Sequence, residues 1–546
     1  MRKISLIFSL VISFLFTQNN FNPAYMASFG SVTIDGKLYN QISFRPEFST
    51  NKIGMGFDIY LYFDEDGKLY RENWDFTSPS ASFKTLVDKI YYFRYGQVLD
   101  DLYFRIGALP KVTLGQGILI NHYANNIDYP QIRRAGIDLR YQFSGFKLQF
   151  IHSDLKEINK PGLIGLRTSI PIIENFNIGF SIASDFNQYN GLVDSDGDNY
   201  PDFVEPDYAN DPDYHHENQF LIEELQGSNY CGYDSESDSF LDGTCENLFN
   251  DLSSEMTEDF ADVMNNKDNV TGLAIDFGFE LDNKFSLYTE YAQLLGKTSD
   301  PTDSNDEDLP DFDTNLGYGF IPIGMKANLG SVKLSLDYRR NSENFIFSYW
   351  NKNYDHNRIM ENNGELITKE STLYKYGDQK GLNFGLEANI SKYFKFSFDY
   401  EKMKGEMWNS GSCDNPDLLY ENENDCESSQ YLQYPDLDPE IQDNQQFGVW
   451  TPGAYKKEKN NSLYLKIEID TSIIPQVQIA EIFYQQTNSK KPFKFEPNQN
   501  SLFGYNIGVN LSNNMIVLLK GRKSYDFDGS NFKPVYNTQI ETSIYF

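Results

Sequence analysis

Apolar and polar residues alternate along most of the chain. In 394–401, aromatic residues occupy the even positions, whereas the odd positions are polar or charged. The segments 332–339 and 463–470 alternate in the same way. A period of two is typical of strands with one apolar and one polar face, so the pattern predicts an all-β protein. Alternation alone also fits a soluble sandwich of antiparallel sheets.

The connections between the strands favour a barrel over a sandwich. Short turns and long polar segments alternate along the chain, as in an up-and-down transmembrane barrel with turns at one end and loops at the other. A spanning strand needs roughly 9–11 residues, which gives about twenty strands here, and sixteen to eighteen also fit. We therefore expect a transmembrane antiparallel up-and-down β-barrel. Its long acidic extracellular loops are expected at 187–268, 296–315, 341–380 and 405–460.

The first residues have the pattern of an export signal. An apolar run at 4–16 follows Arg2 and Lys3, and it is too short to span a bilayer as a helix. We expect a signal peptide at 1–18, for which the sequence leaves the exact cleavage position open. We expect an N-terminal periplasmic or lumen segment at 19–37 and the barrel at 38–546.

The last strand carries a family resemblance. The even positions of 536–546 fall on one face, and the segment ends at Phe546. This resembles Gram-negative outer-membrane β-barrels of the porin type, whose last strand commonly ends in phenylalanine. The resemblance implies that the protein lies in the outer membrane of a Gram-negative-type bacterium, with its long loops outside the cell.

The acidic excess is concentrated in the expected loops. The formal net charge is −33, and 187–268 alone holds 22 Asp or Glu residues and one Lys. Such a chain is a poor partner for nucleic acid. The expected partners are the lipid bilayer, small solutes, and a surface glycan or protein if the loops bind one.

Charged residues on the polar strand faces predict a wet lumen. The candidate lumen-lining residues are Asp138, Arg140, Lys333, Asp337, Arg339, Lys395, Asp399, Lys466 and Glu468.

An enzyme is not expected, because five His residues and the absence of a nucleophile motif give little basis for catalysis.

The acidic segment 194–205 predicts a structural calcium site. Acids stand at positions 1, 3, 5, 9 and 12, with a backbone carbonyl at position 7, and Asn199 replaces the usual Gly at position 6. The segment resembles EF-hand-type and thrombospondin type 3 calcium repeats, which implies Ca²⁺ as a cofactor. The candidate ligands are Asp194, Asp196, Asp198, Tyr200, Asp202 and Glu205, with weaker copies at Asp303, Asn305, Glu307 and Asp311 and at Asp234, Glu236, Asp238 and Asp242.

The four cysteines fall in the acidic insertions as two local pairs. In an exported chain, disulfides Cys231–Cys245 and Cys413–Cys426 are the natural assignment.

Two functions fit these features. The first is a porin-like channel that passes small solutes and has calcium- and disulfide-braced external loops. The alternative is a barrel-anchored surface binding or adhesion protein whose loops are the working part.

Overall fold

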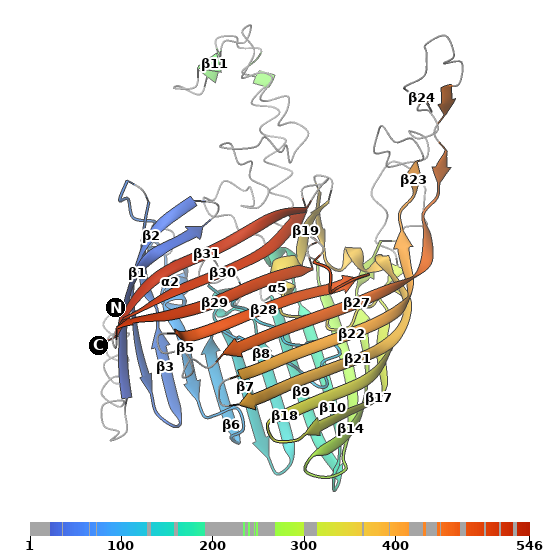
Figure 1. The fold of residues 1–546 in the computed structure, drawn as a ribbon, viewed down its shortest axis with the longest axis horizontal. Coiled ribbons are helices and arrows are strands. Elements are labelled where there is room, and N and C mark those ends of the chain that lie inside the picture. The colour runs from blue at the N-terminus through green and yellow to red at the C-terminus, as the bar shows by residue number, and fades with distance from the viewer. Residues whose placement is uncertain are drawn as a thin grey trace.

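The computed structural model is a closed antiparallel β-barrel (Figure 1). Each wall strand pairs with its neighbours in the chain, and the last strand pairs with the first. Among the described residues the wall has 20 strands when β3 and β4, which are interrupted at Asp58, are counted as one. The structure describes residues 22–34, 37–64, 66–71, 74–127, 133–157, 162–191, 233–234, 239–240, 245, 247–248, 268–299, 314–362, 365–391, 394–413, 430–432, 445–447, 449–469, 477–495, 498, 500–512, 515–527 and 532–545.

The predicted all-β, antiparallel up-and-down architecture is confirmed. The wall strands are β1 (Asn22–Ile34), β2 (Lys37–Ser49), β3 (Ile53–Phe57), β4 (Ile59–Phe63), β5 (Ile90–Tyr95), β6 (Leu102–Gly107), β7 (Gly136–Phe143), β8 (Phe146–His152), β9 (Leu163–Ile173), β10 (Phe176–Asp185), β13 (Val270–Glu280), β14 (Phe285–Leu295), β17 (Tyr318–Asn328), β18 (Val332–Asn341), β21 (Tyr376–Ser391), β22 (Phe394–Asn409), β27 (Ala454–Ile469), β28 (Val477–Ser489), β29 (Ser501–Ser512), β30 (Met515–Phe527) and β31 (Phe532–Tyr545).

Turn chemistry explains why one end of the barrel has short connections. Ser144 and Gly145, between β7 and β8, both have positive φ, at 49° and 85°. Two consecutive positive φ angles match the right-handed twist of the flanking strands in a two-residue hairpin. We call this end of the barrel the tight-turn end and the opposite end the long-loop end.

The outer surface of the barrel is apolar. Side chains on the outward face of the strands remain exposed although they are large and hydrophobic. A contiguous surface of this kind is costly in water and is the surface that lipid tails require. Examples from ten different strands are Phe44, Ile170, Phe180, Leu273, Ile323, Leu336, Leu382, Ile467, Ile482 and Ile540.

The N-terminal prediction is wrong for residues 22–34. They form β1, which pairs with β2 and, from Met26 to Val32, with β31, so this part of 19–37 belongs to the wall and closes it. The inward-facing residues of β1 include small ones, so the sequence does not show a clear alternation of apolar and polar side chains there. Ser28 contacts Ser43, and Gly30 lies against the Ile540 carbonyl.

Short elements occupy the connections. The helices whose bounds lie in the described part of the chain are α2 (Pro79–Asp88) and α5 (Tyr354–Asn357). Among the described residues no helix is long and apolar enough to cross a membrane. The 3₁₀ turns are η2 (Leu155–Glu157), η3 (Gln188–Gly191) and η4 (Ser371–Lys375), and the short strands are β11 (Tyr233–Asp234), β12 (Ser239–Phe240), β15 (Lys297–Thr298), β16 (Thr314–Asn315), β19 (Ile359–Asn362), β20 (Glu365–Thr368), β23 (Ser412–Cys413), β24 (Gln430–Leu432), β25 (Gln445–Phe447) and β26 (Trp450–Thr451).

Two connections fold into the barrel and pair with each other. We call residues 108–127 and 343–358 the plug. The Ser348 N–H donates to the Ile118 carbonyl at 2.8 Å, and the Trp350 N–H donates to the Leu119 carbonyl at 3.1 Å. The prediction of 341–380 as an external insertion is therefore wrong for 343–358. The reason is that its aromatic residues are buried against the wall, which its polar composition did not reveal.

The predicted insertion at 405–460 is also shorter than expected. Strand β22 continues to Asn409 and β27 begins at Ala454, and the two pair along 16 residues each. The wall therefore extends into the segment at both of its ends.

Candidate functional site

One face of the plug is apolar and packs on half of the wall. The rings of Tyr123, Tyr349, Trp350 and Tyr354 are fully buried there. Burying one large apolar side chain contributes about 1.5–3 kcal/mol. This packing fills the lumen on the side of β8 to β17. The inward wall residues that make room for it are small: Gly165, Ala183, Gly272, Ala274 and Ala292.

Buried hydroxyl groups of the plug bind carboxylates and amides. The Tyr354 hydroxyl donates to Asp185 on β10 at 2.8 Å, and the Tyr123 hydroxyl donates to Asp355 of the other plug segment at 2.8 Å. Since buried polar groups cost free energy unless they are hydrogen-bonded, the first contact favours one position of the plug on the wall and the second favours one arrangement of its two segments.

Glu290 on β14 holds the tip of the plug. Its carboxylate is 1% exposed, and its two oxygens accept hydrogen bonds from the Gln116 and Ile118 N–H groups, each at 3.1 Å. Gly115 has a φ of 63°, and a Cβ there would collide with the Glu290 carboxylate. The Lys326 ammonium donates to the Gln116 side-chain oxygen at 2.5 Å. The tip is therefore fixed by hydrogen bonds to the wall.

The opposite face of the plug is polar and points at the other half of the wall. Lys111 Nζ lies 2.6 Å from Glu387 Oε1 on β21, and His122 Nδ1 lies 3.9 Å from Asp399 Oδ2 on β22. Burial and nearby Lys111 lower the pKa of His122, so its ring is neutral at pH 7. These contacts define a charged passage between the plug and β21 to β28.

Lys352 extends the passage toward β27 and β28. Its Nζ lies 3.7 Å from the centre of the Phe483 ring and 5.4 Å from that of Tyr464. Burial and nearby Lys466 lower the pKa of Lys352 to about 8. A cation over aromatic rings is stabilised by their quadrupoles, so this ammonium remains charged at neutral pH.

Four of the nine predicted lumen-lining residues lie on the wall of this passage. Asp399 is beside the plug, as described above. Lys466 Nζ lies 2.7 Å from Glu468 Oε1 and 3.2 Å from Glu481 Oε2, and Lys395 Nζ lies 3.4 Å from Glu468 Oε2. The structure thus brings Lys395, Lys466 and Glu468 into one ion-pair network.

The other predicted lumen-lining residues lie elsewhere on the interior. Lys333 Nζ is 3.8 Å from Glu387 Oε2. On β18, Arg339 donates to Asp337 at 2.6 Å and also contacts Glu401. The remaining two are on the opposite wall, where Arg140 Nη2 donates to Asp138 Oδ2 at 2.7 Å. Contact of any of these residues with a solute stays a prediction.

At the long-loop end, Glu370 joins three connections over the plug, namely those between β10 and β13, between β14 and β17 and between β18 and β21. Its carboxyl oxygens lie 2.7 Å from the donating Lys297 N–H and 3.1 Å from the Gln188 side-chain nitrogen. Gln188 and the Thr368 hydroxyl also donate to Asp268, at 3.0 and 2.7 Å. Burial and neighbouring Asp268 raise the pKa of Glu370 to about 9, so it is protonated at pH 7 and shares its proton with Asp268.

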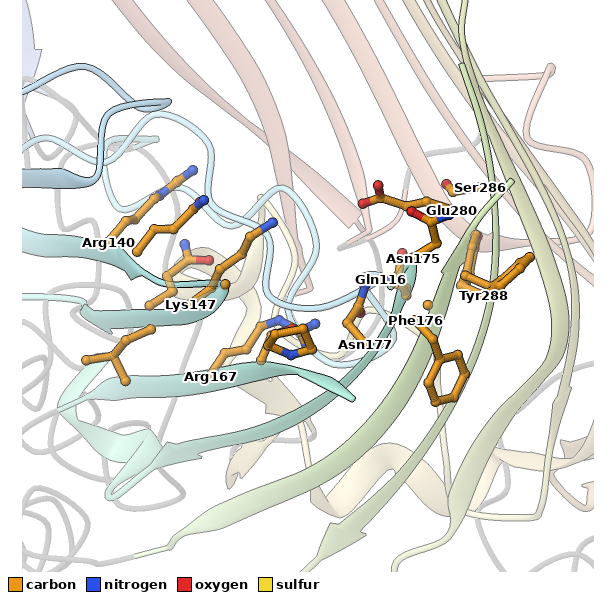
Figure 2. Close-up of a pocket in the computed structure, with 18 of the residues that line it drawn as sticks. Gln116, Arg140, Lys147, Arg167, Asn175, Phe176, Asn177, Glu280, Ser286 and Tyr288 are labelled. Carbon is orange, nitrogen blue, oxygen red and sulfur yellow. The ribbon is translucent and has the colours of Figure 1, made fainter. Parts of the chain in front are cut away.

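A cavity of about 600 Å³ lies below the plug tip at the tight-turn end (Figure 2). Arg140, Lys147 and Arg167 enter it from β7, β8 and β9, and Glu280 and Ser286 lie across from them. The arrangement provides a polar space between the plug and the tight turns.

Comparison with known proteins identifies no family. No family model matches the chain, and no curated protein matches it. Among solved structures, the chain is similar to the siderophore receptor PirA from Pseudomonas aeruginosa, at 9% identity over 97% of this chain and 81% of that one, with a TM-score of 0.31. It is also similar to the outer membrane protein OprD from the same organism, at 7% identity over 97% of this chain and 96% of that one, with a TM-score of 0.30. OpdK of P. aeruginosa with vanillate gives 8% identity, 96% and 98% coverage and a TM-score of 0.29. Likenesses this weak do not identify a solute.

The predicted calcium and disulfide sites fall largely outside the described residues. This holds for the ligands Asp194 to Glu205, for Asp303 to Asp311 and for Cys231 and Cys426, as it does for the signal peptide at 1–18. Cys245 is buried and disulfide-bonded, and no described cysteine is free. In the described part of the chain, no group of three or more His, Cys, Asp or Glu residues is placed to hold a metal. The cysteine pairing and the calcium ligands stay predictions.

Sequence reasoning missed the residues that position the plug. Glu290, Lys111 and Lys352 lie in segments that the alternating pattern does not single out. One available signal was the composition of the wall, because the inward positions of β9 to β14 toward the long-loop end include Gly165, Ala183, Gly272, Ala274 and Ala292. Small apolar inward residues indicate that this half of the wall faces packed protein rather than water.

Proposed function

We propose that the protein is an outer-membrane channel for small polar solutes. The observation that supports this most directly is the asymmetry of the plug, whose apolar face is fixed to one half of the wall while its charged face lines a passage along the other half. A plug that only stabilised the barrel would be apolar on both faces, because each buried unpaired charge lowers the free energy of unfolding.

The outward apolar surface supports a position within a bilayer. A closed barrel leaves no unpaired strand edge, so all backbone hydrogen bonds in the hydrocarbon region are made between strands. We infer that the tight turns face the periplasm and the long acidic connections face the exterior, as is usual for outer-membrane barrels.

Purified protein reconstituted in planar bilayers is expected to give stepwise conductance. Its migration on a gel should also differ between unheated and boiled samples, because closed barrels resist detergent until heated. Folded protein with no conductance under any voltage would contradict the channel. It would favour instead the surface binding protein, whose loops are the working part.

We propose that calcium and disulfides brace the external loops. The supporting observation for calcium is the ligand spacing of 194–205 within a segment that holds 22 acidic residues and one Lys. Carboxylates clustered without cations repel one another until a divalent ion neutralises them. For the disulfides, the support is the local spacing of Cys231 with Cys245 and of Cys413 with Cys426.

Removing calcium is expected to expose the 187–268 loop to protease while the barrel stays intact. Extracellular calcium modules bind at about 10⁻⁴–10⁻³ M, so titration in this range should restore resistance. Asp194→Ala combined with Asp198→Ala should reproduce the effect of chelation. Unchanged cleavage after chelation, or no heat of calcium binding in calorimetry, would overturn the metal site.

A further inference from the structure

Two arginines that form no ion pair with any described residue face each other on the inner wall. Arg94 on β5 lies directly opposite Arg105 on β6 in the strand register. The Arg94 guanidinium donates to the Gly96 carbonyl, and Arg105 Nε donates to the Ala108 carbonyl at 2.7 Å. Within the described residues neither forms an ion pair. Like charges directly opposite across a strand pair are destabilising, so this position needs a physical explanation.

The next three strands also each place one cation on the inner wall. Arg140, Lys147 and Arg167 come from β7, β8 and β9 and extend into the cavity below the plug (Figure 2). Arg140 is paired with Asp138, and Arg167 is paired with Asp276. Lys147 has no ion pair in the described part of the chain. Five adjacent strands therefore supply five cations.

The acids near this row are fewer and are held by other groups. Asp138 lies directly opposite Arg105 in the register of β6 and β7, but its carboxylate accepts hydrogen bonds from Arg140. Asp276 is paired with Arg167, and Glu47 accepts the hydrogen bond of the Tyr92 hydroxyl. Asp100 and Glu280 lie at the edge of the cavity. Arg94, Arg105 and Lys147 therefore remain available to an external anion.

The geometry of the row favours an oxyanion. A guanidinium presents a planar fork of donors that matches a carboxylate or phosphate bidentately. Arg105 Cζ lies 4.9 Å from the centre of the Tyr92 ring, and Arg140 Cζ lies 5.6 Å from the centre of the Tyr103 ring. Each of these two guanidinium groups is therefore positioned by an aromatic ring. An anion bridging Arg94 and Arg105 would remove their repulsion.

We propose that the inner face of β5 to β9 is a binding track for small oxyanions, with Arg94 and Arg105 as its central site and Lys147 as its continuation in the cavity. This rests on the proposed channel function and deepens it by naming the solute class. The track lies across the lumen from Glu387, Asp399 and Glu481 on β21 to β28. The two walls therefore favour solutes of opposite charge.

The test compares two double variants of the full chain. In Arg94→Gln/Arg105→Gln the central site is removed. In the control Lys402→Gln/Lys404→Gln an equal charge is removed from exposed positions of β22 that alternate with its inward residues. Succinate and inorganic phosphate are the probes. Calorimetry on the detergent-solubilised protein measures binding, and reversal potentials in gradients of their potassium salts measure permeability.

We expect the arginine variant to bind the preferred probe about tenfold or more weakly, because it loses two charge-assisted hydrogen-bonding groups. The anion-to-cation permeability ratio should fall with it, while the control keeps wild-type binding. The tighter probe identifies whether the track suits carboxylates or phosphates. Lys147→Gln, whose side chain is exposed and unpaired, is the second variant if the arginine pair is needed for folding, and it should weaken binding in the same direction.

The results separate this inference from the channel function. Equal binding by the wild-type protein, the arginine variant and Lys147→Gln, or no binding by the wild-type protein, overturns the track even if the protein conducts. Binding that the arginine variant loses supports the track even if no conductance is seen, and in that case it is the channel function that fails.

Discussion

Replacing Glu290 with alanine is expected to raise the single-channel conductance severalfold and to make the open current noisier. The substitution leaves the Gln116 and Ile118 N–H groups without their acceptors. A buried unsatisfied donor costs about 1–3 kcal/mol, so the docked position of the tip loses most of its preference over an undocked one. Planar-bilayer recordings at fixed salt measure the change.

Glu280→Ala is the matched control, because it also removes a glutamate from the barrel interior, but one that lines the cavity below the plug tip and is not an acceptor of the Gln116 and Ile118 N–H groups. It should leave the conductance near the wild-type value. Equal conductance of Glu290→Ala and the wild-type protein, in barrels that both keep heat-modifiable migration, would show that the plug does not narrow the passage.

The wall of the barrel could be predicted from the sequence because a strand face is a local pattern. Alternation over 394–401 or 463–470 needs no knowledge of distant residues, and these segments lie in β22 and β27. The same pattern placed Lys466 and Glu468 on one face, where they form an ion pair at 2.7 Å.

The plug could not be predicted in this way because its stability comes from contacts distant in sequence. Trp350 is buried only because Leu119 and Gly272 lie against it. In the chain it is followed by the polar residues 351–353, which give the segment the appearance of an exposed loop. The clamp by Glu290 joins residues 172 and 174 positions apart, which no local pattern encodes.

Raising the pH is expected to loosen the long-loop end of the barrel, because Glu370 is held in its protonated form. Its pKa of about 9 is above the usual value of about 4.3. A carboxyl whose pKa is raised in the folded state gives stability that is complete below its unfolded pKa and is lost as the pH rises through its folded pKa. The docked loops should therefore weaken between about pH 4 and pH 9, as Glu370 ionises beside Asp268.

Hydrogen exchange of backbone amides in 296–299 and 368–375 measures this loosening. In Glu370→Gln the amide can still donate to Asp268 and accept from the Lys297 N–H, but it does not titrate, so protection of these amides should become nearly independent of pH. Glu343→Gln, an exposed substitution in the same connection, should keep the wild-type pH dependence. Glu370→Gln could instead lose protection at alkaline pH as steeply as the wild-type protein. In that case another group controls the pH dependence of these connections, and the proton shared by Glu370 and Asp268 does not hold the loops together.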